Sequence, residues 1–177
     1  MNTPISQSVQ PPRSEPAPAR LRRFASMMYE GVLLFGVVFL AGYAFDTLTQ
    51  SRHGLALRHT RQALLFLAIG FYFILCWRRS GQTLPMKAWN IRLVSTTGGQ
   101  LTMRQMLVRY ACMWVFPAAG AFAVWVLAEW TAWPSVLMLI VAAPFTVFIP
   151  TLFATNQQFW HDKMAGTLLV STPVNKK

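Results

Sequence analysis

Long apolar runs separated by short polar stretches dominate the chain after its first twenty residues. The first run, residues 24–48, would reach about 37 Å as a helix, which exceeds the roughly 30 Å of a bilayer's hydrocarbon core. The second, residues 62–77, is shorter, and the aliphatic stems of its flanking arginines would complete a crossing. The third apolar region, residues 106–153, is too long for one helix and is interrupted before Pro134, which suits the first turn of a new helix.

This pattern predicts an all-α integral membrane protein with four transmembrane helices. The expected spans are residues 24–48, 62–77, 106–128 and 133–153. The alternative for the last region is one span followed by a re-entrant segment.

The polar stretch between the second and third runs has secondary-structure signals of its own. Residues 91–94 alternate apolar and polar positions like a strand, residues 97–99 are typical of a turn, and Leu101 resumes an extended segment. We therefore expect a small β-hairpin-like loop on the cytoplasmic face between helices 2 and 3. Thr102 followed three residues later by Gln105 predicts a capping box at the start of the third helix.

Composition supports the membrane assignment and divides the chain into three parts. Hydrophobic residues make up 54% and charged residues 12%, about half the charged share of a soluble domain. The net charge of +11 lies between apolar runs and not on a polar face, so we expect no nucleic-acid partner. Five prolines in the first twenty residues predict a disordered cytoplasmic arm over residues 1–21. A transmembrane domain over residues 22–170 and a basic tail over residues 171–177 follow.

The distribution of basic residues predicts the orientation in the membrane. With four spans and a cytoplasmic N-terminus, thirteen basic residues fall inside and three outside, so the positive-inside rule places both termini in the cytoplasm of a cell inner membrane. The inside residues are Arg13, Arg20, Arg22, Arg23, Arg78, Arg79, Lys87, Arg92, Arg104, Arg109, Lys163, Lys176 and Lys177, and the outside residues are Arg52, Arg58 and Arg61.

Glu30 is the ionisable residue placed most clearly within an apolar run. Such a group is costly in a membrane unless it is paired or wetted, so it is a candidate for a functional site. Arg109, at a similar depth on the third helix, is the expected partner, with Arg23 at the surface above the pair. One interpretation is an ion pair that fixes helix register, and the other is a proton or cation relay through Glu30.

Other polar residues indicate neither an enzyme nor a cofactor site. Asp46 and Glu129 lie near the outer ends of helices, where water reaches them. His53 and His59 lack a Cys or carboxylate at metal-ligand spacing, and nothing beside His161 resembles a nucleophile motif. We therefore expect no catalytic residue, no metal and no cofactor.

Several short motifs in a fixed order resemble the RDD family of bacterial membrane proteins. The matching positions are Arg23 and Glu30, then residues 81–84, 87–89 and 91–94, then Arg109, then residues 161–167. The likeness covers about residues 22–170. The resemblance implies a membrane fold, and it marks Gly81, Gln82, Thr83, His161 and Gly166 as family-motif residues.

The family is named for one arginine and two aspartates, and the resemblance assigns these positions. Arg23 matches the arginine and Asp162 the later aspartate, whereas Glu30 replaces the first aspartate and Pro85 stands where the family usually has glycine. Some members are linked to sodium–proton antiport, and others have no established role. We expect an arginine among Arg23, Arg92 and Arg109 to neutralise Asp162.

Two functions follow from this charged cluster, defined here as Arg23, Glu30, Arg109 and Asp162. The first is a structural or accessory membrane component that uses the cluster for packing. The second is a small secondary transporter, coupled to sodium or protons, that uses Glu30. The expected partners are the lipid bilayer, anionic lipid head groups, and a second copy or another membrane protein.

Overall fold

A computed structural model describes residues 17–49, 57–150 and 159–172. The predictions for residues 1–16 of the arm, for His53, for the end of the fourth span at 151–153 and for residues 173–177 of the tail lie outside these residues. The described chain is mostly helical, with one two-stranded sheet. Its elements are α1 (Arg20–Thr49), α2 (Arg58–Ser80), α3 (Leu84–Ala88), β1 (Ile91–Ser95), α4 (Met103–Met113), α5 (Val115–Thr131), η2 (Pro134–Phe148), α7 (Trp160–Ala165) and β2 (Thr167–Ser171).

Three helical segments are long and apolar enough to cross a membrane: α1, α2, and α4 continued by α5. Their apolar side chains stay largely exposed, as along α1, where Val32, Phe35 and Phe39 are more than half accessible. Soluble monomers rarely expose apolar surface of this extent, and these faces suit contact with a bilayer. The predicted spans 24–48, 62–77 and 106–128 therefore correspond to observed helices.

The fourth predicted span contains η2, a shorter apolar 3₁₀ helix of 15 residues. The predicted break before it is present, because α5 ends at Thr131 and η2 begins at Pro134. Another break separates α4 from α5 at Trp114. Pro117 explains it, because a proline lacks the N–H for a helical bond and its ring clashes with the carbonyl four residues earlier, at Met113.

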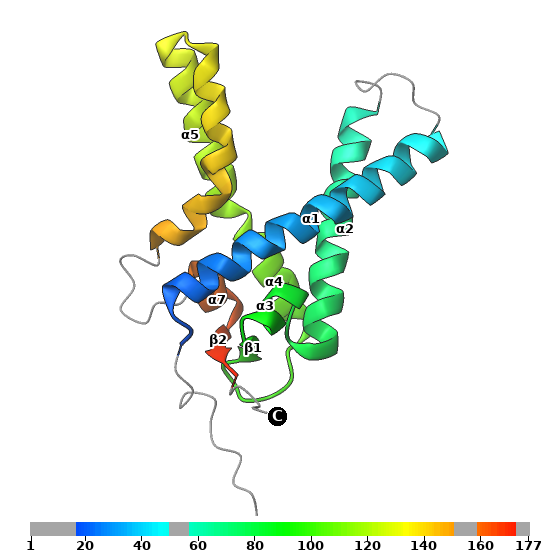
Figure 1. The fold of residues 1–177 in the computed structure, drawn as a ribbon, viewed down its shortest axis with the longest axis vertical. Coiled ribbons are helices and arrows are strands. Elements are labelled where there is room, and N and C mark those ends of the chain that lie inside the picture. Colours follow the sequence, from blue (N-terminus) through cyan, green and yellow to red (C-terminus); the bar gives the residue numbers. More distant parts are fainter. Residues whose placement is uncertain (1–16, 50–56, 151–158, 173–177) are drawn as a thin grey trace, which may run out of the picture.

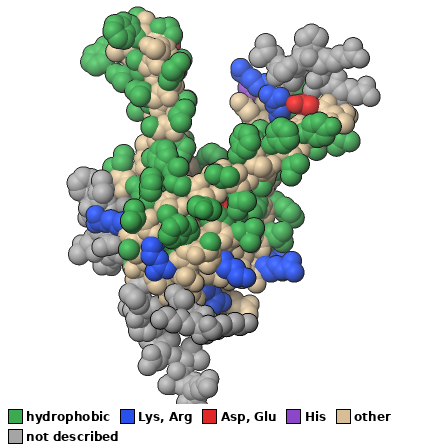
Figure 2. Space-filling view, viewed as in Figure 1, with side chains coloured by type: hydrophobic (Ala, Val, Ile, Leu, Met, Phe, Trp, Pro, Cys, Tyr) green, Lys and Arg blue, Asp and Glu red, His purple; other side chains and the backbone are tan. Residues whose placement is uncertain are grey.

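The elements form two helical hairpins that diverge from a common base (Figure 1). One hairpin is α1 with α2 and the other is α5 with η2, while α3, α4, α7 and the sheet lie at the base, where the first and last described residues also lie. On the face that Figure 2 shows, apolar side chains cover the hairpins, most Lys and Arg side chains lie around the base, and a few lie at the tip of the α1–α2 hairpin. The polar and charged parts of the fold therefore gather mainly at one end of the apolar helices.

The strand at 91–95 does not form a local hairpin, so the predicted hairpin-like loop is wrong in its pairing. β1 pairs antiparallel with β2 near the C-terminus, in the register Ile91↔Ser171 to Ser95↔Thr167. The turn after β1 leads directly to Thr102, which caps α4, so no residues remain there for a return strand. The predicted Thr102–Gln105 capping box is present in full.

Small residues allow the two helices of the second hairpin to approach closely. A Cβ placed on Gly120 of α5 would lie 2.6 Å from Thr146 Cγ2 of η2. Such a contact leaves room for a hydrogen atom only, so Gly120, within the Ala- and Gly-rich stretch at 118–123, allows η2 to pack directly against α5.

Candidate functional site

The candidate site lies at the base, where one face of α1 turns toward α2, α4 and α7. Arg23, Ser26 and Glu30 follow each other at intervals of three and four residues, so they share one side of the helix. All three are buried, although the rest of α1 is mostly exposed. A polar stripe buried at one end of an apolar helix is unusual enough to require specific partners.

Glu30 finds its partners among neutral hydroxyl groups. Tyr72 Oη of α2 donates a hydrogen bond to Glu30 Oε1 at 2.7 Å, and Thr83 Oγ1 donates to Oε2 at 2.5 Å. Thr83 is also the residue that caps α3, where its hydroxyl accepts from the Met86 N–H. One carboxylate therefore connects α1, α2 and the start of α3.

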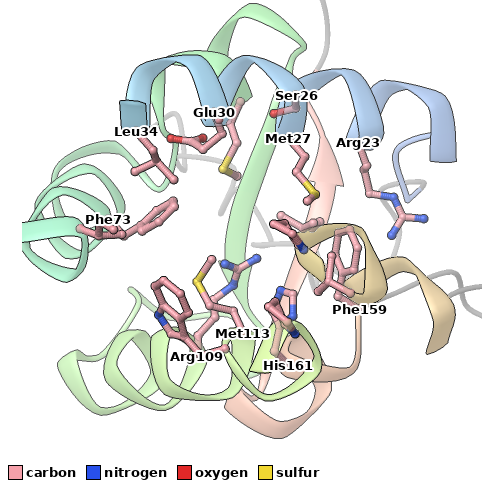
Figure 3. Close-up of a pocket in the computed structure, with 18 of the residues that line it drawn as sticks. Arg23, Ser26, Met27, Glu30, Leu34, Phe73, Arg109, Met113, Phe159 and His161 are labelled. Carbon is pink, nitrogen blue, oxygen red and sulfur yellow. The ribbon is translucent and has the colours of Figure 1, made fainter. Parts of the chain in front are cut away.

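Arg109 pairs with Asp162 and not with Glu30. Its Nη2 lies 2.7 Å from Asp162 Oδ1, and the Asp162 side chain is 0% exposed. The predicted Glu30–Arg109 ion pair is therefore wrong, although the two residues lie on opposite sides of one pocket (Figure 3). Of the three arginines proposed to neutralise Asp162, the structure selects Arg109, because α7 lies against α4.

Two arginines of the charged cluster each lie over an aromatic ring. The Arg23 guanidinium lies 5.0 Å from the centre of the Phe159 ring, and Phe159 stacks on His161 at an interplanar angle of 11°. The Arg109 guanidinium lies 4.6 Å from the centre of the Trp77 ring. Contacts of this kind stabilise a buried guanidinium by about 2 kcal/mol or more. Arg23 was expected at the surface, but it is only 4% exposed.

The motif residues Gly81, Gln82 and Gly166 hold the base together through the backbone. Gly81 ends α2 with a φ of 67°, and its carbonyl accepts from the Leu93 N–H at 2.8 Å. Gln82 Nε2 donates to the Ile91 carbonyl at 2.7 Å. Gly166 ends α7 at a φ of 63°, and its carbonyl accepts from Gln105 Nε2 of α4. Both glycines therefore occupy turns whose positive φ favours glycine.

Other ionisable residues lie apart from this site. Asp46 lies 3.5 Å from Arg61 near the far ends of α1 and α2, with both side chains more than a third exposed. Glu129 and His59 are exposed. Within residues 17–49, 57–150 and 159–172, no three His, Cys, Asp or Glu side chains gather as a metal site.

Burial lowers the pKa of His161 from 6.5 to about 4, an effect that the Asp162 charge opposes and the Arg109 charge reinforces. The unfolded chain therefore binds a proton between about pH 6.5 and pH 4 that the folded chain does not. Above pH 6.5 this group does not change the free energy of unfolding. As the pH falls below 6.5 the free energy of unfolding decreases, and the total decrease is about 3 kcal/mol once the pH is below both pKa values.

We expect His161→Gln to flatten this dependence on pH. The free energy of unfolding, measured in detergent micelles at pH 7.5 and pH 4.5, should fall by about 2 kcal/mol less in the variant than in the wild type. His59→Gln, at an exposed position, is the matched control and should keep the full decrease. Equal decreases in wild type and His161→Gln would show that His161 is not the group responsible.

Comparison with known proteins adds one finding to this geometry. A family model described as RDD family matches residues 17–166. No curated protein and no solved structure matches the chain. The matched range contains every residue of the charged cluster and both glycine turns.

Proposed function

The chain belongs to the RDD family of membrane proteins, and on that premise we propose that it is an accessory component of the cell inner membrane without enzymatic activity. In this role the charged cluster fixes the packing of the base against the membrane-facing helices. A partner, either a second copy or another membrane protein, then recognises the assembled unit. The observation that carries this proposal is that the carboxylates of the cluster are already engaged inside the chain.

Both carboxylates have a partner within the described chain. Asp162 is fully buried against Arg109, and each oxygen of Glu30 accepts a hydrogen bond from a hydroxyl. A carrier for protons or cations must exchange its partner during each cycle, whereas a packing residue keeps it. The arrangement of Glu30 therefore favours packing over transport.

We propose further that both termini are cytoplasmic and that η2 is a fourth crossing. The described ends of the chain lie together at the base, where most of the Lys and Arg side chains on the face shown in Figure 2 also lie (Figures 1 and 2). A 3₁₀ helix rises about 2.0 Å per residue, so the 15 residues of η2 extend about 30 Å, close to the thickness of the hydrocarbon core. The basic residues of the base would also attract anionic lipid head groups.

The experiment that tests the accessory role is a flux measurement on Glu30→Gln. Purified protein is reconstituted in vesicles, and proton and sodium fluxes are followed with entrapped dyes under imposed gradients. We expect no flux above empty vesicles for the wild type or for the variant. Because an amide still accepts one hydrogen bond, Glu30→Gln should remain folded and lose about 1–2 kcal/mol of stability.

Glu129→Gln is the matched control, since Glu129 is an exposed carboxylate away from the cluster. A wild-type flux that Glu30→Gln abolishes and Glu129→Gln preserves would contradict the accessory role. That result would establish the alternative, a small secondary transporter that uses Glu30.

A further inference from the structure

A cavity of about 350 Å³ lies at the charged cluster, and its lining residues come mainly from α1, α2, α4, α5, η2 and the segment that includes α7. Ligand sites in proteins typically enclose about 300–1,000 Å³, so this volume suits one acyl chain better than two. Five of its twenty lining residues are polar: Arg23, Ser26, Glu30, Arg109 and His161.

The cavity lining changes from polar to apolar in the same direction along three helical segments: α1, α2, and α4 continued by α5. On α1 the lining passes from Glu30 to Leu34, and on α4 and α5 it passes from Arg109 to Met113 and then Pro117. Helix α2 runs in the opposite direction and ends at the base, so its lining passes from Trp77 near the base to Ile69 farther from it. The polar end therefore faces the base and the apolar end faces the hairpins, which is the arrangement an amphiphile needs.

Three buried nitrogens at the polar end have no hydrogen-bond partner among the described residues: Trp77 Nε1, Arg109 Nε and His161 Nδ1. Their side chains are 2%, 6% and 5% exposed, and all three residues line the cavity. Buried polar groups in native proteins are nearly always hydrogen-bonded, so these atoms indicate where a polar group of a ligand would lie. In Figure 3 Arg109 and His161 are both directed into the pocket.

The chemistry of these nitrogens specifies the polar group. The indole and guanidinium N–H groups are donors. His161 Nε2 lies 3.5 Å from Asp162 Oδ1, which favours the tautomer with the proton on Nε2 and leaves Nδ1 as an acceptor. Two donors beside one acceptor match a head group that has both a carbonyl and a hydroxyl. Of the charged residues that line the cavity, Arg109 is neutralised by Asp162, and the Glu30 carboxylate offsets Arg23, so the polar end has no excess positive charge to bind a phosphate.

We propose that this cavity binds a single-chain lipid with an uncharged, hydroxylated ester head group, the class to which monoacylglycerols belong. The head group accepts from Trp77 and Arg109 and donates to His161, while its chain follows the apolar lining toward the hairpins. The source is the surrounding bilayer. The proposal rests on the cavity and does not depend on the accessory role.

The test is native mass spectrometry of the purified full-length protein titrated with monoolein. We expect one bound molecule, and weaker binding of lysophosphatidylglycerol with the same acyl chain. Gly31→Leu should weaken monoolein binding about tenfold, because Gly31 lines the cavity and a Cβ there meets no atom within 4 Å, which leaves room for a larger side chain at the lining. Gly36→Leu, an equally open position on α1 that does not line the cavity, should bind as the wild type does.

Trp77→Phe tests the head-group contact by removing one donor and should weaken binding about fivefold. If Gly31→Leu fails to fold, Trp77→Phe alone tests the proposal. Its control is Trp130→Phe, because Trp130 is 88% exposed. Wild-type binding in Gly31→Leu or Trp77→Phe would overturn the proposal. Equal losses in Gly36→Leu, or lysophosphatidylglycerol binding at least as tight as monoolein, would also overturn it.

Discussion

Asp162→Asn should lower the free energy of unfolding by about 3–5 kcal/mol, the largest effect expected from a single conservative change in this chain. Asp162 is fully buried, and its partner Arg109 is 2.7 Å away. The substitution leaves the buried Arg109 guanidinium charged and without the counter-ion that lies 2.7 Å from it. The effect is measured by titration with denaturing detergent, followed through tryptophan fluorescence.

Asp46→Asn is the matched control for this prediction, because it removes the aspartate of the exposed pair with Arg61. Exposed pairs contribute about 0–1 kcal/mol, so this variant should stay within that range. If Asp162→Asn cost as little as Asp46→Asn, the ion pair at the base would not stabilise the fold.

Gly81→Ala should cost about 2–4 kcal/mol for two separate reasons. The residue has a φ of 67°, which an alanine adopts only with strain. In addition, a Cβ at this position would lie 2.8 Å from the Leu93 carbonyl oxygen, a backbone atom that cannot move without disturbing β1. The free energy of unfolding in micelles reports the combined cost.

Gly99→Ala separates this effect from a general effect of losing a glycine. Gly99 lies in the turn after β1, where a Cβ meets no atom within 4 Å. We expect a change within about 0.5 kcal/mol there. A Gly81→Ala variant as stable as Gly99→Ala would show that the end of α2 adjusts freely, and the role given to this glycine would then be wrong.

The sequence alone was sufficient to predict the structural features that depend on residues close together in the chain. Hydrophobic length predicted the three helices of span length, Pro134 predicted the start of η2, and Thr102 with Gln105 predicted the cap of α4. Each of these is determined within about one helical turn or by the length of a single apolar run. The choice of an arginine for Asp162 also succeeded, because a buried carboxylate requires a cation when one is within reach.

Long-range pairing could not be predicted in the same way. β1 pairs with β2, more than seventy residues away in the sequence, and the pattern of apolar and polar residues in one strand does not identify the other. The prediction of Arg109 as the partner of Glu30 was wrong because it considered only charge. The carboxylate instead accepts hydrogen bonds from the neutral hydroxyls of Tyr72 and Thr83. Arg23 was predicted at the surface because its contact with the Phe159 ring could not be foreseen, since Phe159 follows the last apolar run, far away in the sequence.

The most direct test of the central claim, that a buried ion pair holds α4 against α7 at the base, is a double-mutant cycle. Arg109→Met, Asp162→Asn and the double variant are compared with the wild type by their free energies of unfolding in micelles. The structure predicts that the double variant loses at least about 2 kcal/mol less than the two single losses added together, because removing both charges leaves neither one unpaired. Single losses that add to within about 0.5 kcal/mol would contradict the claim.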